Sequence, residues 1–267
     1  MEWEDDFEYQ PDTEAEEYEK SARDAIEAVF DEDRERVFFA NQLAIRHERQ
    51  FFHWITARAI DALIGEGVVR TETRELSSGS AIKLLWHRSH RYYKRDAKRV
   101  VQLVEEYGSP NICAALGLQA EALVLEGFAR REFLLRGRHA NEFGGKKWTK
   151  TGHNLDFIFE RDGRVYGVEV KNTLSYMKQS ELTTKMEMCD QLGIIPVFAV
   201  RMLPKNWIND VIQGGGYAMI MRFQFYPWSQ AALAKEVATE LGLPVDTPKA
   251  LAEGTMDRFL AWHAKKL

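Results

Sequence analysis

The sequence predicts an α/β fold, with a mixed central sheet flanked by helices and a smaller unit of helices and a hairpin before it. Apolar runs of strand length alternate with helical patterns from residue 112 to residue 225, which is typical of a layered α/β core. Asp162 and Gly163 separate two of these runs and predict a tight hairpin. Gly108, Ser109 and Pro110 interrupt the helical pattern and set a domain boundary near residue 110.

Charge is distributed unevenly along the 267 residues. The formal net charge is −5, but residues 1–36 hold sixteen acidic and four basic residues, which leaves +7 on residues 37–267. We expect residues 1–36 to form an acidic leader that is partly disordered, with disorder over residues 1–14 and a charged helix over about residues 16–30. This leader either keeps the protein soluble or competes with nucleic acid for the basic remainder.

Composition also argues against a membrane-spanning protein, a disulfide-rich protein and a cysteine metal site. No apolar run approaches the roughly 20 residues that a membrane-spanning helix needs. Two cysteines are too few for a disulfide framework and lack the spacing of metal ligands. We therefore expect a cytoplasmic protein with no membrane attachment.

Residues 37–88 predict two helices followed by a hairpin. The stretch VFFANQLAIRHE has apolar residues at helical spacing, and FHWITARAIDALIGEG predicts a second helix. The apolar face of this second helix is expected to hold Trp54, Ile55, Ala59, Ile60, Leu63 and Ile64. The strand-like runs VVRTETREL and AIKLLWHR enclose a Ser-Ser-Gly-Ser turn. This order of elements resembles a winged helix-turn-helix domain, with residues 91–107 as a basic connecting helix.

The winged-helix resemblance implies contacts with DNA. Twelve Lys or Arg residues stand against six acidic ones between Arg46 and Arg99, so phosphates are the predicted ligands. The resemblance places Arg49, His53, Thr56 and Arg58 near the start of the recognition helix, and Arg70, Arg74 and Lys83 on the wing. A packing or oligomerisation module is the alternative, because winged helices also mediate protein contacts.

Residues 111–228 are expected to form the α/β core, in the order helix, three strands, helix, strand. The later helix covers roughly Tyr176 to Leu192, and YAMIMRFQF is expected to be a further strand. The last segment, residues 229–267, is predicted to be helical. It either packs on the core or forms a dimer interface.

The candidate chemistry lies on two neighbouring strands. Because side chains alternate along a strand, Glu169 and Lys171 share one face. Leu155, Phe157 and Phe159 are expected on one face of the preceding strand and Asp156 on the other, so the hairpin brings Asp156 beside Glu169. Two adjacent carboxylates flanked by buried aliphatic residues repel each other and lose solvation. A divalent cation removes both costs, and carboxylate oxygens are ligands that Mg²⁺ prefers.

Asp156 in NLDFIFE and Glu169-Val170-Lys171 in VYGVEVKN resemble the PD-(D/E)XK, or restriction-endonuclease-like, nuclease superfamily. This superfamily includes type II restriction enzymes and archaeal Holliday-junction resolvases. The resemblance covers about residues 112–203, and Leu155 stands where the family motif has proline. It implies a nuclease dependent on Mg²⁺ or Mn²⁺ that hydrolyses DNA phosphodiester bonds, acting as a two-fold homodimer.

The resemblance also assigns roles to residues. Asp156 and Glu169 are the implied metal ligands, and Lys171 assists the attacking water or stabilises the transition state. Family members place a further acid on a helix before the first core strand. Glu121 fits that position best and is the implied third catalytic acid and metal ligand, with Glu126 as the competitor. Two alternatives remain: a non-catalytic DNA-binding protein with an inactive nuclease-like domain, and a structure-specific or RNA-directed nuclease.

Other side chains are candidates for contacts with phosphate. Lys146, Lys147 and Trp148 form either a loop that touches DNA, with Trp148 stacked on a base, or a solvated loop with one packed aromatic ring. Lys178 and Lys185 are seven residues apart, so they share a helix face that meets phosphate or solvent. His153 is expected to cap the start of its strand, with the metal site as its alternative role, and His139 is a weaker candidate.

Overall fold

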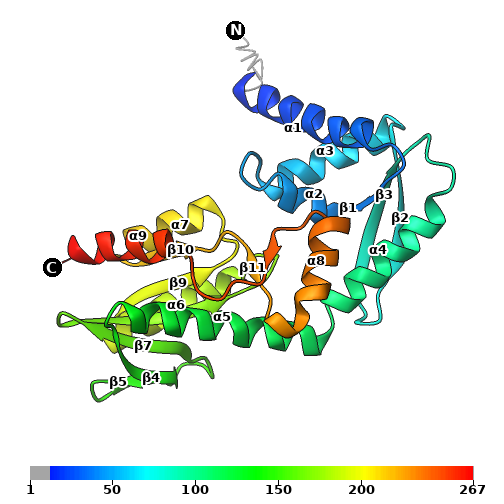
Figure 1. The fold of residues 1–267 in the computed structure, drawn as a ribbon. Coiled ribbons are helices and arrows are strands. Elements are labelled where there is room, and N and C mark those ends of the chain that lie inside the picture. Colours follow the sequence, from blue (N-terminus) through cyan, green and yellow to red (C-terminus); the bar gives the residue numbers. More distant parts are fainter. Residues whose placement is uncertain (1–12, 267) are drawn as a thin grey trace, which may run out of the picture. The chain divides into compact units, whose positions relative to one another are not determined.

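The structure, a computed structural model, describes residues 13–266 and divides into two compact units (Figure 1). Unit 1 runs to Glu106 and includes Leu241–Leu243, and unit 2 comprises Tyr107–Glu240 and the chain from Pro244 onward. The predicted α/β class with a mixed sheet is confirmed. Residues 1–12, on which most of the predicted disorder falls, lie outside the described residues.

Unit 1 combines helices with a three-stranded antiparallel sheet. Its elements begin with α1 (Thr13–Glu32), β1 (Val37–Phe39), α2 (Ala40–Arg46), α3 (His53–Gly65), β2 (Val69–Glu75), β3 (Ala81–His87) and α4 (Tyr93–Tyr107). The strands are ordered β1-β3-β2, with β2 and β3 forming the predicted hairpin. Helix α1 buries Ala22, Ile26, Val29 and Phe30, which fall on one helix face. The acidic segment is therefore helical and packed in unit 1 over residues 13–32.

Two predictions about unit 1 are wrong. Val37–Phe39 is a buried strand paired with β3, not the start of a helix. Trp54 is 47% exposed, whereas Thr56, expected to face nucleic acid, is completely buried. Ile55, Ala59 and Leu63 set the rotation of α3 by repeating every four residues, and this turns Thr56 inward and Trp54 outward.

Unit 2 is built on a five-stranded mixed sheet of order β10-β9-β8-β7-β4. Strands β4 (Leu134–Ala140), β7 (Leu155–Arg161) and β8 (Arg164–Lys171) are antiparallel, while β9 (Ile195–Val200) and β10 (Tyr217–Ile220) run parallel to β8. Asp162 and Gly163 have φ values of 51° and 71°, which the tight turn between β7 and β8 requires.

Helices connect and cover this sheet. Helix α5 (Pro110–Arg130) precedes β4, and α6 (Gln179–Leu192) makes the crossover from β8 to the parallel strand β9. The predicted order of helix, three strands, helix and strand is thus present. The remaining elements are the short hairpin β5 (Glu142–Phe143) and β6 (Lys146–Lys147), α7 (Lys205–Gln213), β11 (Gln224–Phe225), the 3₁₀ turn Trp228–Gln230, α8 (Ala231–Glu240), β12 (Val245–Asp246) and α9 (Glu253–Ala264).

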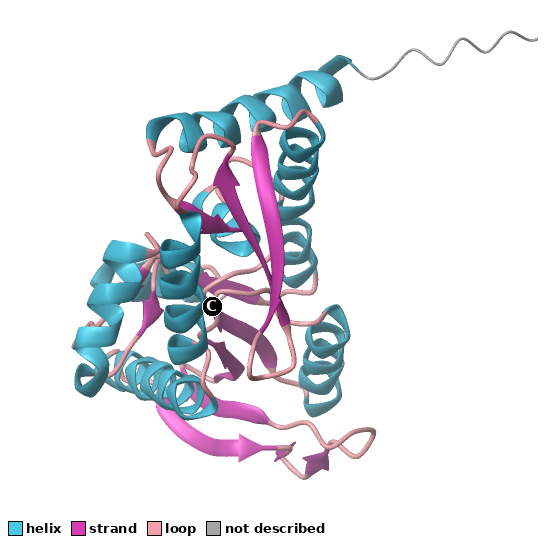
Figure 2. Ribbon diagram, turned by 90° about the vertical axis from the view of Figure 1, so that its right-hand side faces the viewer, coloured by secondary structure: helices cyan, strands magenta, loops and turns pink. Residues whose placement is uncertain are grey.

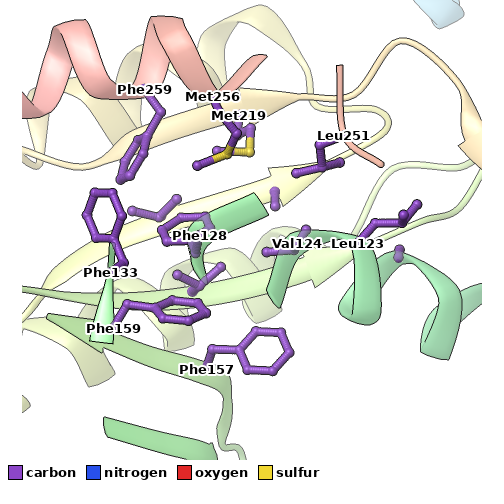
Figure 3. Packing of buried hydrophobic residues seen from close by; sticks show 14 of the residues in the cluster. Leu123, Val124, Phe128, Phe133, Phe157, Phe159, Met219, Leu251, Met256 and Phe259 are labelled. Carbon is purple, nitrogen blue, oxygen red and sulfur yellow. The ribbon is translucent and has the colours of Figure 1, made fainter. Parts of the chain in front are cut away.

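Figure 2 shows the helices and strands of the fold in a second view. Separate hydrophobic clusters cover the two faces of the five-stranded sheet. On one face, Phe128 of α5 and Phe259 of α9 pack with Phe133 and Phe159 (Figure 3). The other face is covered by α6. The C-terminal helix α9 therefore packs on the core.

Helix α5 is long and apolar enough to cross a membrane by length and composition, alone among the helices of residues 13–266. The expectation that no such stretch exists missed it because Glu121 and Glu126 interrupt its apolar run. One such helix is weak evidence of a membrane span, since core helices of soluble proteins pass the same test. Ala120, Leu123 and Val124 of α5 are buried in the core cluster.

Candidate active site

The candidate site lies where the antiparallel pair β7–β8 ends. The last paired residues are Phe157 and Val168, so Asp156 and Glu169 occupy the next positions along the two strands. Asp156 Oδ2 accepts a hydrogen bond from the backbone N–H of Val170 at 2.7 Å. The structure therefore brings the two predicted acids to neighbouring strand positions.

Leu155 departs from the predicted alternation. Phe157 and Phe159 lie in the cluster formed with α5, but Leu155 packs in the cluster formed with α6. The regular ladder between β7 and β8 stops before Asp156, so the alternation of side chains no longer determines where Leu155 points.

Gly167 allows α6 to lie close to β8. A Cβ atom at this position would stand 2.8 Å from both Cys189 Sγ and Leu155 Cδ1. Lys185 lies one turn before Cys189, and Glu169 lies two residues after Gly167 on the same strand face. The close approach of helix and strand therefore places Lys185 over Glu169.

Lys185 is a buried partner of Glu169. Its ammonium group donates hydrogen bonds to Glu169 Oε2 and to the backbone carbonyl of Asn154. The side chains of Lys185 and Glu169 are only 5% and 7% exposed. The structure thus places Lys185 in the interior, whereas the sequence analysis placed it on a face that meets phosphate or solvent.

Burial and mutual repulsion keep the two acids from ionising easily. Burial, followed by the charge of Asp156, raises the pKa of Glu169 to about 7, against the opposing effects of Lys185 and Lys171. Burial also raises the pKa of Asp156, while the Val170 N–H and the Lys185 charge act to lower it. The pair therefore needs positive charge to be fully ionised, and Lys185 supplies part of it.

Lys171 extends from the same strand face as Glu169 but is more open to solvent. Its ammonium nitrogen lies 2.8 Å from Glu181 Oε1 of α6, and the two side chains are 33% and 21% exposed. Neither the role of Glu181 nor the pairing of Lys185 with Glu169 was predicted from the sequence. A signal for Lys185 was present, because it stands between Leu182 and Cys189 on the apolar face of α6.

Glu121 influences the site through the effect of its charge on the pKa of Asp156. Its carboxylate lies 3.4 Å from Arg138 of β4, and its charge contributes to the raised pKa of Asp156. Glu126 pairs instead with Arg130 on the surface of α5, at 2.7 Å. Of the two competitors, Glu121 is therefore the one that acts on Asp156.

His139 is the neighbour of Asp156 on the other side. Arg138 pairs with Phe157 and Ala140 with Leu155, so His139 stands opposite Asp156 in the register of β4 and β7. Its φ of 47° is unusual for a residue within a strand, and its charge acts to lower the pKa of Asp156. The sequence analysis gave this residue little weight because nothing local in the sequence predicts that register.

The remaining candidates are spread over several elements. Trp148 is almost completely buried and donates from Nε1 to Thr151 Oγ1, so it is not available to stack on a base. Lys146 and Lys147 are exposed on β6, and Lys178 is exposed just before α6 begins. His153 is exposed, with Nδ1 2.8 Å from Thr151 Oγ1. Of the two arginines predicted for unit 1, Arg49 is exposed and Arg58 pairs with Glu19.

No family model, curated protein or solved structure matches this chain. The family resemblance therefore remains a prediction, supported by the motif and by the geometry at the end of β7 and β8.

The donor set fits one mode of metal binding. Within residues 13–266, no group of three or more His, Cys, Asp and Glu side chains is arranged to hold a metal ion. Asp156 and Glu169 alone match the way Mg²⁺ is commonly held, by one or two carboxylates with water and substrate phosphate completing the shell. Their resistance to ionisation also fits, since a cation offsets the repulsion between them. Glu121, held by Arg138, is not part of this pair.

Proposed function

We propose that this chain is a metal-dependent endonuclease that hydrolyses phosphodiester bonds of DNA at a site formed by Asp156, Glu169 and Lys171. The observation that carries the proposal is the meeting of two carboxylates of raised pKa at neighbouring strand ends, with a lysine two residues after the second. The order α5, β4, β7, β8, α6 and β9 supports a PD-(D/E)XK core in unit 2.

In this mechanism, Asp156 and Glu169 are the residues that would hold Mg²⁺ or Mn²⁺. When bound, the metal supplies a water of lowered pKa and a countercharge for the phosphate. Glu181 holds the ammonium group of Lys171 at the open side of the site. From there Lys171 donates a hydrogen bond to the attacking water or to a phosphate oxygen as negative charge develops. Lys185 balances the charge of Glu169 before metal binds.

Unit 1 has the proposed role of recruiting the substrate. Its element order of helix, strand, two helices and a hairpin supports a winged-helix domain. A homodimer, in which each protomer cuts one strand, and a cytoplasmic location belong to the same proposal.

A second candidate function follows from the Lys185–Glu169 pair. The ammonium group already neutralises the acid that a metal would use, which favours a DNA-binding protein with an inactive nuclease-like domain. The protein would then bind DNA without cutting it.

A cleavage assay separates the two candidates. Purified protein is incubated with linear duplex, branched and single-stranded DNA and with RNA, in Mg²⁺, Mn²⁺ or EDTA. We expect metal-dependent cleavage of DNA that falls at least about 100-fold in Lys171→Ala, while DNA binding in EDTA is retained. Lys205→Ala, at an exposed lysine of α7, is the matched control and should cut normally. Binding without cleavage of any substrate would support the inactive module instead.

A further inference from the structure

Within residues 13–266, three of the five lysines and arginines predicted to touch DNA in unit 1 are neutralised by acids, while Arg70 of the wing is not. The three form ion pairs with N–O distances of 2.5, 2.7 and 2.6 Å: Arg58 with Glu19, Arg74 with Glu72, and Lys83 with Asp61. The predicted recognition helix and wing therefore present less positive charge than the sequence suggests.

A second group of arginines in unit 1 lacks such partners. Arg70, Arg88 and Arg91 line a cavity of about 520 Å³ and are all exposed. In the part of unit 1 that the structure describes, no carboxylate forms an ion pair with any of the three. Three unneutralised guanidinium groups around one cavity attract a multiply charged anion, and their geometry matches phosphate oxygens.

The fold builds the walls of this cavity from the end of the hairpin and the loop before α4. Arg70 of β2 is paired with Trp86 of β3, and the chain from Arg88 to Tyr93 connects β3 to α4. The rings of Trp86 and Tyr93 stack with centroids 3.9 Å apart and planes 8° from parallel. The cavity therefore has a packed aromatic wall beside its arginines.

The loop on the other side is held by local hydrogen bonds. Ser89 Oγ lies 2.6 Å from His87 Nδ1, and His90 Nε2 lies 3.1 Å from Asp96 Oδ2. The backbone N–H of Ser89 also donates to His87 Nδ1 at 3.3 Å, and burial is the main cause that lowers the pKa of this imidazole. These bonds position the backbone between Arg88 and Arg91.

An exposed aromatic residue lies in the chain between two residues that line the cavity. Tyr92 is 86% exposed and stands between Arg91 and Tyr93, although its own side chain is not part of the cavity wall. An unpaired aromatic ring beside a cluster of arginines is typical of sites for single-stranded nucleic acid, where bases stack on the ring and arginines hold the phosphates. The cavity volume is in the range of small-ligand pockets, about 300 to 1,000 Å³, and is large enough for a phosphate with its sugar.

We propose that this cavity binds an unpaired nucleotide of a nucleic-acid strand, with its phosphate on Arg70, Arg88 and Arg91 and its base stacked on Tyr92. Bases within a duplex stack on one another and do not offer a free face to Tyr92. Unit 1 therefore prefers a single strand to a blunt duplex. This inference goes beyond the proposed nuclease function, because it involves neither Asp156, Glu169 nor a metal.

Fluorescence anisotropy on the full chain in EDTA tests the proposal. The probes are a labelled single strand of about twelve nucleotides, as DNA and as RNA, and a blunt DNA duplex of the same sequence. We expect the DNA or RNA strand to bind about tenfold more tightly than the duplex. Arg88→Ala combined with Arg91→Ala should weaken strand binding at least about tenfold and reduce its salt dependence, because phosphate contacts are lost.

Tyr92→Ala and two control variants make the result specific. Tyr92→Ala should weaken strand binding about tenfold and leave the salt dependence unchanged, since stacking carries no charge. Arg34→Ala, at an exposed arginine of unit 1 paired with Asp31, should bind as the unchanged protein does. Circular dichroism and thermal melting establish that each variant is folded.

Three results would overturn the proposal. These are equal binding of the strand and the duplex, normal strand binding by the folded Arg88→Ala/Arg91→Ala variant, and loss of binding in Arg58→Ala alone. Because no cleavage is measured, each result leaves the nuclease proposal to its own assay.

Discussion

The two charged regions of this protein differ in whether their charged side chains are buried and paired or exposed and unpaired. At the end of β7 and β8, Glu169 is buried against Lys185, and Asp156 accepts the Val170 N–H. In the cavity of unit 1, exposed arginines form no ion pair with any acid of residues 13–266. An ionised group taken out of water costs several kcal/mol unless it is paired, whereas an exposed guanidinium is satisfied by solvent.

This contrast teaches what each region is able to do. At the buried pair Asp156 and Glu169, ionisation is unfavourable unless a metal, a proton or Lys185 offsets the negative charge. Substitutions there should therefore change both the unfolding free energy and the chemistry of the site. The exposed arginines contribute little to the unfolding free energy, so replacing them should weaken ligand binding and leave stability nearly unchanged. The predictions below test this difference, beginning with the largest effect.

Lys185→Met should be the most damaging single change. It keeps most of the side-chain volume and leaves Glu169 buried without its partner, and breaking a buried ion pair typically costs about 3–5 kcal/mol. Urea unfolding in EDTA at pH 8 measures the loss of unfolding free energy. The loss should shrink at pH 5, where Glu169 is protonated. Lys150→Ala, which breaks the exposed pair with Glu187, is the control and should cost less than about 1 kcal/mol. An equal loss of unfolding free energy in the two variants would contradict the distinction between buried and exposed charges.

The pH dependence of stability should show the raised pKa of Glu169. Its pKa is about 7 in the folded protein and near 4.5 when unfolded, so between these values the unfolded chain ionises while the folded chain stays protonated. The contribution of Glu169 to stability is therefore complete below pH 4.5 and is lost as pH rises to 7, by roughly 3 kcal/mol.

Comparison with Glu169→Gln isolates this effect from the other titrating groups. The unfolding free energy of the metal-free protein, relative to Glu169→Gln, should fall between pH 4.5 and 7, and excess Mg²⁺ should reverse the fall at neutral pH. A difference between the two proteins that is constant across this range would contradict the assigned pKa.

Gly167→Ala should have an intermediate effect. The added methyl group would meet Cys189, Leu155 and Ile194 at 2.8 to 2.9 Å, and overpacking of this kind costs about 1–3 kcal/mol. Because the methyl pushes α6 from β8, it should also weaken the contact of Lys185 with Glu169. Thermal unfolding gives the first effect. A larger pH dependence than that of the unchanged protein would show the second, because Lys185 lowers the pKa of Glu169 and a weaker contact lets that pKa rise further. An unchanged melting temperature would mean that the helix does not depend on this glycine.

Lys83→Ala should have the smallest effect. It breaks an exposed ion pair with Asp61, and such pairs contribute about 0.2–1 kcal/mol. Urea unfolding at low and high salt should show little change in either condition. A loss above about 2 kcal/mol would show that the exposed charges of unit 1 are also structural.

Much of the site was available from local patterns. The Asp162–Gly163 turn, the alternation along Val165–Lys171 and the helix that follows depend on residues within a few positions of each other, and the structure contains all three. These features predicted that Asp156 and Glu169 meet at one end of the strand pair, because turn chemistry and strand period are properties of short segments.

The partners of those residues depend on longer distances. Lys185 contacts Glu169 because Gly167 allows α6 to pack close to the sheet. Arg58 forms an ion pair because α1 places Glu19 beside it. A sequence shows which residues carry charge and of which sign, but not the distances between these charged groups in space. Electrostatic energies change steeply over a few ångströms, so which charges are buried, paired or left free was decided by how helices pack on the sheets.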